Sequence, residues 1–300
     1  LKKKKLVLTA SDNDITIQTT IEPKEEDDFT VESEGSIIIQ GKYILDIVRK
    51  LPDKFINIEV IDELKILIYT ENSEFNLNGI SESEYPNIGL EESKKKVNIK
   101  AGDIKNIVNQ TAFATSNEES KPVLTGINFN IVGDVLECNA TDSYRLSRKV
   151  LKLDKPSEEN YNIVIPSHNI IEFSKILTDD DEEVELHVFS NKILFKTENL
   201  KFESRLINGT YPNTSNLLPD DSFLVITTSL NAFYDVIDRV SILTSDKEKN
   251  IVTLETNGNM LVLRSSSAEI GRVEEKMPIT KNNSEDIKIS FSAKYMMEAL

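Results

Sequence analysis

Two kinds of apolar spacing alternate along the chain. In many short stretches apolar and polar residues alternate with a period of two, which is typical of β-strands with one buried face. Between groups of such stretches, apolar residues recur every three or four positions, as they do on one face of an α-helix. The helical spacing covers 42–51, 103–114, 168–177 and 229–243. The strand spacing includes 5–9, 15–21, 126–132, 134–140, 144–152, 251–256, 260–265 and 270–276.

The order of these elements defines a repeating unit of one strand, one helix and three further strands. The strands that lead into the four helices are predicted at 36–40, 97–100, 162–165 and 224–227. A chain in which single helices alternate with groups of strands is typical of the α+β class. The sequence therefore predicts an α+β protein.

One segment of the chain occurs twice. Residues 65–75 recur as residues 192–202, an offset of 127 (192 minus 65), with seven of the eleven positions identical. Downstream, Asn78-Gly79 and Tyr85-Pro86-Asn87 have counterparts in Asn208-Gly209 and Tyr211-Pro212-Asn213. A third copy begins near the end, where residues 293–296 resemble residues 41–44, 252 positions earlier (293 minus 41). The fold is therefore expected to be built by duplication.

Two units make a domain of about 125 residues, which is an ordinary domain size. We expect three domains in tandem, at 1–92, 93–219 and 220–300. Measured against this repeat, the first domain lacks its opening strand and helix, and the third lacks its closing strands. We therefore expect the sequence to be a piece of a longer protein.

Basic residues recur on the polar faces of the predicted helices. At about 100° per residue, Tyr43, Ile47 and Val48 share one face of the first helix, opposite Lys42 and Arg49. The same projection leaves Lys105 and Lys175 on the polar faces of the next two helices. Arg239 lies on the fourth helix among acidic neighbours. Solvated charge on ordinary amphipathic helices is the alternative, but the recurrence favours deliberate segregation of positive charge.

The overall charge taken alone argues against binding to nucleic acid, because it is −16 at pH 7 and phosphate contacts need clustered Lys and Arg. The acidic runs, however, fall in predicted loops at 25–28, 158–159 and 179–183. The longest apolar runs reach only strand length, so no membrane span is expected. The one cysteine, Cys138, is predicted to be a buried thiol, which fits a reducing, cytoplasmic location.

Catalytic and metal-binding patterns are not evident. His168 and His187 lie in different predicted elements, and neither has a His or Cys neighbour at zinc-ligand spacing. Asp142 and Arg145 form a single acid and base pair, which is weak evidence for catalysis. No phosphate-binding glycine loop occurs, so we expect no cofactor, no metal and no active site.

Four segments resemble one known family. They are Phe-Asn-Leu-Asn-Gly at 75–79, Ala-Thr-Asp-Ser-Tyr-Arg-Leu at 140–146, Ser-Arg-Leu-Ile-Asn-Gly-Thr-Tyr-Pro-Asn at 204–213 and Ile-Ser-Phe-Ser-Ala-Lys-Tyr-Met at 289–296. The chain resembles, over essentially its whole length, the beta subunit of bacterial DNA polymerase III, the sliding clamp. The resemblance also accounts for the internal repeat.

The resemblance implies a ring that encircles double-stranded DNA without sequence preference. In this family two chains close head to tail, with sheets outside and helices lining the hole. Carried over to this sequence, the DNA-facing residues are Lys42, Arg49, Lys105, Lys121, Lys175 and Arg239. The dimer interface would join Tyr43, Ile47 and Phe75 of one chain to Ile242 and Leu243 of its partner. For Ile47 and Phe75, a plain core role is the alternative.

The resemblance further implies a peptide-binding pocket for the DNA polymerase III alpha subunit, the clamp loader and other replication and repair proteins. Its residues would be Thr141, Ser143, Tyr144, Arg145, Leu146, Pro212, Asn216 and Leu217. Asn216 departs from the arginine of some relatives, and the strand that completes the pocket wall is missing from this sequence. A non-catalytic processivity subunit of a DNA-directed DNA polymerase, a nucleotidyltransferase, is thus the expected function. An acidic scaffold or adhesin-type repeat protein is the competing interpretation, and an enzyme the weakest.

Overall fold

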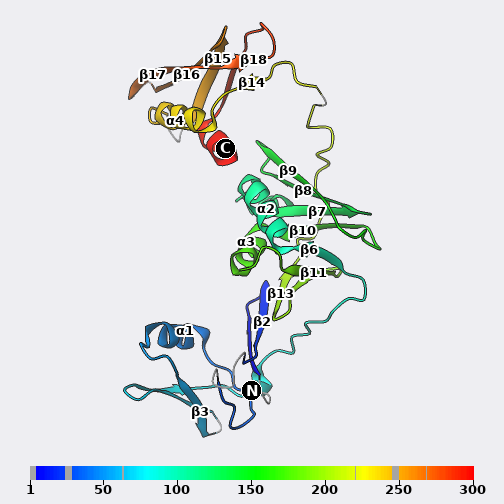
Figure 1. Ribbon diagram of the computed structural model, residues 1–300, viewed down its shortest axis with the longest axis vertical. Helices are drawn as coiled ribbons and strands as arrows, with labels where there is room; N and C mark the ends of the chain where they lie inside the picture. The colour runs from blue at the N-terminus through cyan, green and yellow to red at the C-terminus, as the bar shows by residue number, and fades with distance from the viewer. Residues whose placement is uncertain (1–4, 24–28, 63, 220, 245–249, 268) are drawn as a thin grey trace. The chain divides into compact units, whose positions relative to one another are not determined.

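The computed structural model describes residues 5–23, 29–62, 64–219, 221–244, 250–267 and 269–300. By internal packing, the described residues of 1–105, 129–136 and 150–208 form one compact unit. Those of 106–128, 137–149 and 209–300 form another. Figure 1 shows short helices between groups of antiparallel strands, and this confirms the predicted α+β class.

The first part of the chain contains a hairpin and a separate three-stranded sheet. Strands β1 (Leu6–Ser11) and β2 (Ile15–Ile21), both predicted from spacing, pair with each other, and β2 joins a larger sheet through β13 (Leu200–Arg205). Helix α1 (Gly41–Lys50) precedes the sheet β3-β4-β5, formed by Asn57–Asp62, Lys65–Tyr69 and Glu74–Asn78. The strand expected at 36–40 is reduced to one bridge between Ile38 and Ile80.

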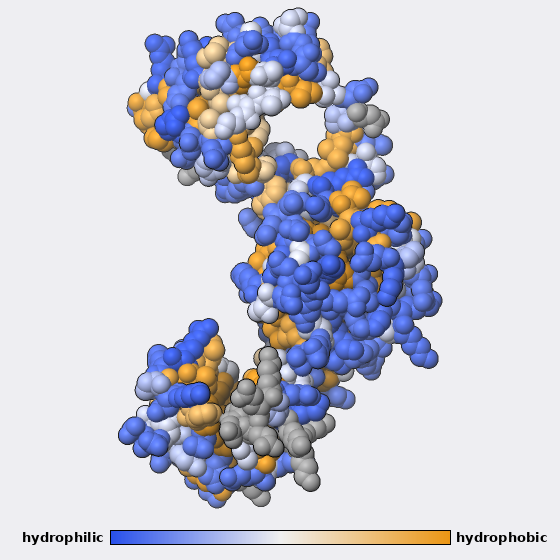
Figure 2. Space-filling view, in the orientation of Figure 1, coloured by the Kyte–Doolittle hydropathy of each residue, from blue (hydrophilic) through white to orange (hydrophobic). Residues whose placement is uncertain are grey.

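The apolar face of α1 is less covered than its spacing predicts. No residue of this helix is buried, and Tyr43 and Val48 are 52% and 47% exposed. Every residue of β3 is also exposed, so the described residues give these apolar side chains few neighbours. The fully buried residues of this sheet are Ile66 and Ile68 of β4. Figure 2 shows hydrophobic surface in this part of the chain.

The next part contains two complete copies of the predicted unit. In one, β6 (Val97–Lys100) leads through α2 (Ala101–Thr111) to β7 (Gly126–Val132), β8 (Val135–Thr141) and β9 (Leu146–Lys152). In the other, β10 (Tyr161–Pro166) leads through α3 (Ser167–Ile176) to β11 (Glu183–Val188), β12 (Lys192–Lys196) and β13. The strand orders are β1-β2-β13-β12-β11-β6 and β10-β7-β8-β9.

The buried stripes of these two helices agree with the predicted faces. Ile104 and Ile107 of α2 and Ile170 and Phe173 of α3 are at most 1% exposed. Phe173 lies 4.5 Å from Phe195 and 5.0 Å from Phe202, ring centre to ring centre. Cys138 is fully buried, which raises the pKa of its thiol well above the usual value.

The last part repeats the unit once more. A short β14 (Ile226–Thr227) pairs with β18 (Thr280–Lys281), and α4 (Leu230–Ser241) follows it. Figure 1 shows α4 against the sheet β17-β16-β15-β19, formed by Gly271–Pro278, Met260–Ser267, Ile251–Asn257 and Lys288–Ser292. Val236, Ile237 and Val240 pack on this sheet. Helix α5 (Ala293–Ala299) follows β19, where the sequence predicts a third copy.

Candidate nucleic-acid interface and peptide pocket

The start of α2 is covered by the acidic turn at 179–183. The backbone N–H groups of Ala101 and Gly102 donate to the carbonyl oxygens of Glu182 and Asp180, both at 2.9 Å. Lys105 Nζ donates to Asp180 Oδ1 at 2.6 Å. The turn is exposed, as predicted, but it also caps this helix and pairs with its lysine.

Two more of the predicted DNA-facing cations carry carboxylate partners. Lys175 of α3 lies 2.6 Å from Glu172, one turn earlier, and this hydrogen bond lowers the pKa of Glu172. Arg239 of α4 binds Glu275 of β17 through two parallel bonds, Nε to Oε1 at 2.8 Å and a terminal nitrogen to Oε2 at 2.6 Å. This bidentate pair lowers the pKa of Glu275.

The other three predicted cations are open to solvent. Lys42 and Arg49 lie on α1, and Lys121 lies in the loop before a short 3-10 turn at Pro122–Thr125. None of the three makes an ion pair with a residue that the structure describes. Within the described part of the chain the six cations therefore fall into two groups, three paired and three unpaired.

The loop between β8 and β9 brings five predicted pocket residues together. Thr141 Oγ1 donates to the Arg145 carbonyl at 2.6 Å and accepts from the Ser143 N–H at 3.1 Å. Asp142 Oδ1 accepts from the N–H groups of Tyr144 and Arg145 at 2.9 and 3.0 Å. Ser143 has φ 80°, a left-handed conformation that costs about 1–3 kcal/mol outside glycine. The loop is a tight hydrogen-bonded turn.

Arg145 is the most firmly held of these residues. Its Nε donates to Asp142 Oδ2 at 3.1 Å, and its guanidinium also pairs with Glu298 of α5. The guanidinium carbon lies 4.3 Å from the ring centre of Tyr295 and 5.5 Å from that of Phe113. Planar stacking together with bonds to two different carboxylates is a role that lysine cannot fill. Sequence reasoning missed Phe113, Tyr295 and Glu298, because they are far away along the chain.

The remaining pocket residues lie close to the surface, and three of them follow a buried tyrosine in the chain. Tyr211 is buried, and its hydroxyl accepts from the Thr141 N–H at 3.0 Å. Burial raises the pKa of Tyr211 to about 12. Pro212, Asn216 and Leu217 follow it and are exposed. Leu146 is half-buried, whereas Tyr144 and Leu217 are 71% and 64% exposed and offer apolar surface.

The predicted interface residues are mostly accessible. Tyr43 and Ile242 are exposed, with Ile242 at 70%. Ile47, Phe75 and Leu243 are half-buried, so none of the five is a fully enclosed core residue.

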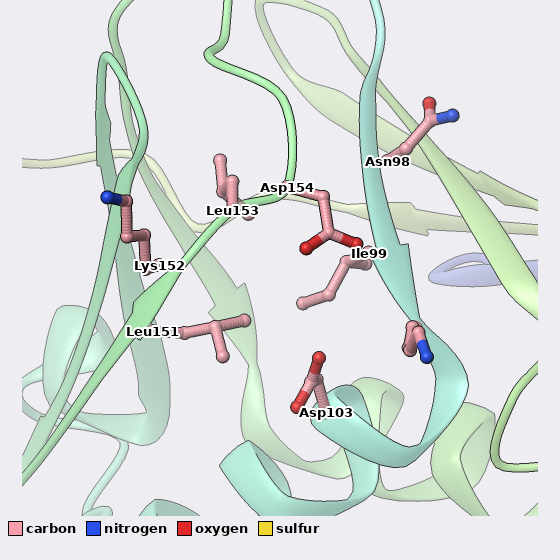
Figure 3. A pocket seen from close by; sticks show the side chains of 8 residues that line it. Asn98, Ile99, Asp103, Leu151, Lys152, Leu153 and Asp154 are labelled. Carbon is pink, nitrogen blue, oxygen red and sulfur yellow. The ribbon is translucent and has the colours of Figure 1, made fainter.

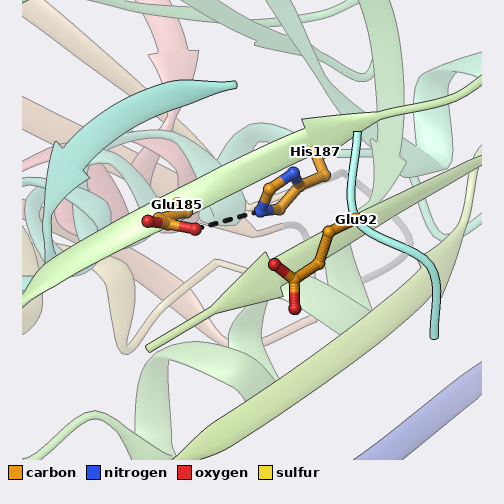
Figure 4. A group of neighbouring side chains, drawn as sticks. All are labelled: Glu92, Glu185 and His187. Carbon is orange, nitrogen blue, oxygen red and sulfur yellow. Dashed lines mark hydrogen bonds and ion pairs between the residues drawn. The ribbon is translucent and has the colours of Figure 1, made fainter. Parts of the chain in front are cut away.

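A group of possible metal ligands was not predicted from the sequence. Glu92, Glu185 and His187 lie with one ligand atom each within 4.8 Å of one another (Figure 4). Hydrogen bonds from Lys196 and Lys201 lower the pKa of Glu92 to about 2, and Lys96 and Lys196 pair with Glu185. The carboxylates thus already have cationic partners. The spacing of Glu185 and His187 on one strand face was the signal available in the sequence.

A pocket of about 270 Å³ lies between the β6–α2 junction and the end of β9, and none of its lining residues belongs to the predicted sites (Figure 3). The carboxylates of Asp103 and Asp154 point toward it beside Ile99 and Leu151. No helix in the described part of the chain has the length and hydropathy needed to span a bilayer.

Comparison with family models accounts for nearly the whole chain. Residues 1–89 match the N-terminal domain of the DNA polymerase III beta subunit, residues 98–213 its central domain and residues 215–300 its C-terminal domain. The chain therefore belongs to the DNA polymerase III beta subunit family.

Individual relatives agree. The beta sliding clamp of Bacillus subtilis (strain 168) is 40% identical over 296 residues, which cover 97% of this chain and 78% of the relative. That of Staphylococcus aureus (strain Mu50 / ATCC 700699) is 37% identical over 302 residues, covering 100% and 80%. The crystal structure of the sliding clamp from Bacillus subtilis matches with a TM-score of 0.91 at 38% identity, covering 99% of this chain and 79% of that one. A sliding clamp from Pseudomonas aeruginosa bound to griselimycin, at 22% identity, shows the fold alone, with a TM-score of 0.91 and coverage of 100% and 79%.

Proposed function

We propose that this protein is a sliding clamp that encircles duplex DNA and tethers the replicative DNA polymerase during synthesis. The proposal rests chiefly on three successive clamp-domain matches spanning 1–300 with two short gaps. We assign the domains to 1–92, 93–219 and 220–300, and the assembly to a head-to-tail homodimer in the cytoplasm. The protein has no catalysis of its own in this proposal and acts as the processivity subunit of the polymerase.

The distribution of charge supports a DNA role despite the net charge of −16. The six cations assigned to DNA lie on helices or in one loop, whereas acidic runs such as 179–183 lie in turns. A ring holds DNA by topology, so a few non-specific phosphate contacts are enough. The competing interpretation, an acidic scaffold, gives no reason for basic residues to recur on successive helices.

Retention on DNA of different topology tests the ring. The protein should be loaded onto nicked circular DNA by a clamp loader and then followed by gel filtration. We expect it to stay on the circle and to be lost within minutes after the DNA is linearised, because a ring leaves only over a free end. Blocking the ends of the linear DNA with a bound protein should restore retention. Equal loss from circular and linear DNA would contradict the ring and indicate an ordinary DNA-binding protein.

The loop at 141–146 is the proposed docking site for polymerase and loader peptides. Replacing Arg145 and Leu146 together by Ala should weaken binding of a polymerase C-terminal peptide at least about tenfold, since interface anchors contribute 2 kcal/mol or more. Isothermal titration calorimetry measures the affinity, and sedimentation should show an unchanged dimer.

A matched control lies on the same strand. Arg148 and Val150 of β9 are exposed, and Arg148 pairs with Glu137 rather than with the loop. Their double replacement by Ala should leave peptide affinity within about twofold of the unmodified protein, because surface changes away from a site have small effects. If both double variants lose the same affinity, the pocket lies elsewhere. The variant R145K keeps the positive charge but removes the planar guanidinium, so it separates the effect of charge from that of stacking.

A further inference from the structure

Half of the cations assigned to DNA already hold a carboxylate of the same chain. These are Lys105 with Asp180, Lys175 with Glu172 and Arg239 with Glu275. Lys105 pairs with a carboxylate in a turn, Lys175 with one on its own helix, and Arg239 with one on a strand. The common result is that a carboxylate oxygen of the same chain already lies at ion-pair distance from each cation.

The geometry of the pairs sets how readily they open. The Lys105 side chain is 27% exposed, but that of Asp180 is 73% exposed, so solvent reaches the pair mainly from the acid side. The Glu172 side chain is 40% exposed, and that of Glu275, which accepts two bonds from Arg239, is 26% exposed. Surface pairs of this kind contribute roughly 0.2–1 kcal/mol. They are weak enough for a phosphate to displace and strong enough to compete with it.

We propose that Asp180, Glu172 and Glu275 act as tethered phosphate mimics that weaken the contacts of Lys105, Lys175 and Arg239 with duplex DNA. The inference rests on the proposed function and deepens it. Lys42, Arg49 and Lys121 bind phosphate directly, whereas the paired cations exchange between a carboxylate and a phosphate. A mobile ring benefits, because each phosphate contact that must break adds resistance to sliding along the helix.

The test is a salt titration of duplex binding by fluorescence anisotropy. The variant D180N/E172Q/E275Q keeps the shapes of the three side chains and removes their charges. We expect its affinity at low salt to rise about two- to fivefold for each released cation. The slope of log affinity against log salt should steepen by up to about 0.9 for each new phosphate contact.

A control variant separates this effect from a general gain of positive charge. D134N/E159Q/E274Q also removes one Asp and two Glu charges, from carboxylates that pair with Lys152, Lys95 and Arg264. Those cations are outside the proposed DNA-facing set. This control should gain clearly less affinity and keep the original slope.

The outcomes are distinct. Equal gains in the two triple variants would overturn the inference and leave the clamp function intact. Failure of the loaded, unmodified protein to stay on nicked circular DNA would overturn both. Replacing Lys105 by Ala provides an internal check: K105A/D180N should bind like K105A, since Asp180 acts through that lysine. An undiminished gain from D180N in the K105A background also contradicts the mechanism. Circular dichroism of each variant monitors folding.

Discussion

The two copies of the eleven-residue repeat form the same hairpin in different surroundings. In the first copy Ile68 pairs with Phe75, and in the second the equivalent Phe195 pairs with Phe202. Phe195 and Phe202 are fully buried against Phe173, whereas Phe75 is half-buried and α1, the helix equivalent to α3, has no buried residue. The repeated residues therefore fix the hairpin and its register, but they do not fix how much of it is covered.

The largest expected difference between the copies concerns these phenylalanines. Replacing Phe202 by Ala should lower the free energy of unfolding by about 3–5 kcal/mol, because it leaves a cavity beside Phe173 and Phe195. Replacing Phe75 by Ala should cost less than about 1.5 kcal/mol, because that side chain is only half-buried. Urea unfolding followed by circular dichroism compares them. Similar costs would mean that the first hairpin is as enclosed as the second.

The tyrosines that follow the two copies should differ less. Tyr211 is buried and accepts from the Thr141 N–H at 3.0 Å, whereas Tyr85 donates to the Thr9 carbonyl at 3.4 Å. Replacing Tyr211 by Phe leaves the buried N–H without that partner, which should cost about 1–3 kcal/mol. Replacing Tyr85 by Phe should change stability by less than about 0.5 kcal/mol. Hydrogen exchange at the Thr141 amide gives a local readout, and unchanged protection in the Tyr211 variant would contradict this role.

The smallest effect expected is pH-dependent and belongs to the second copy alone. Lys196 and Lys201 hold Glu92, but the equivalent residues of the first copy are Tyr69 and Glu74. The pKa of Glu92 falls from 4.5 to about 2, so its stabilising effect is complete above pH 4.5 and is lost as the pH falls toward 2. Because Glu92 is 37% exposed, solvent limits the effect to about 1 kcal/mol or less.

The variant E92Q isolates this contribution. At pH 7 it should be slightly less stable than the unmodified protein, and the difference should shrink as the pH is lowered from 4.5 to 3. Urea midpoints at each pH measure the difference. A constant difference would show that Glu92 acts through packing rather than charge.

Most of the elements and their order could be predicted from the pattern of apolar residues. Period-two and helical spacing located β7 to β9, β15 to β17 and the four long helices within one or two residues at most ends, because local periodicity reports directly which face of an element is buried. The repeat also identified equivalent positions, such as Phe75 and Phe202. The strand predicted at 36–40 was wrong, since only a single bridge forms there. A strand needs a paired neighbour, and spacing alone does not show whether one is present.

Which side chains meet could be learned only from the folded chain. Projection placed Lys105, Lys175 and Arg239 on polar faces correctly, but their carboxylate partners include Asp180 and Glu275, which are distant in the sequence. The same holds for Arg145 with Tyr295 and Glu298, and for Glu92 with His187. Such contacts join elements brought together only by folding, and hydrophobic spacing carries no information about which charge faces which.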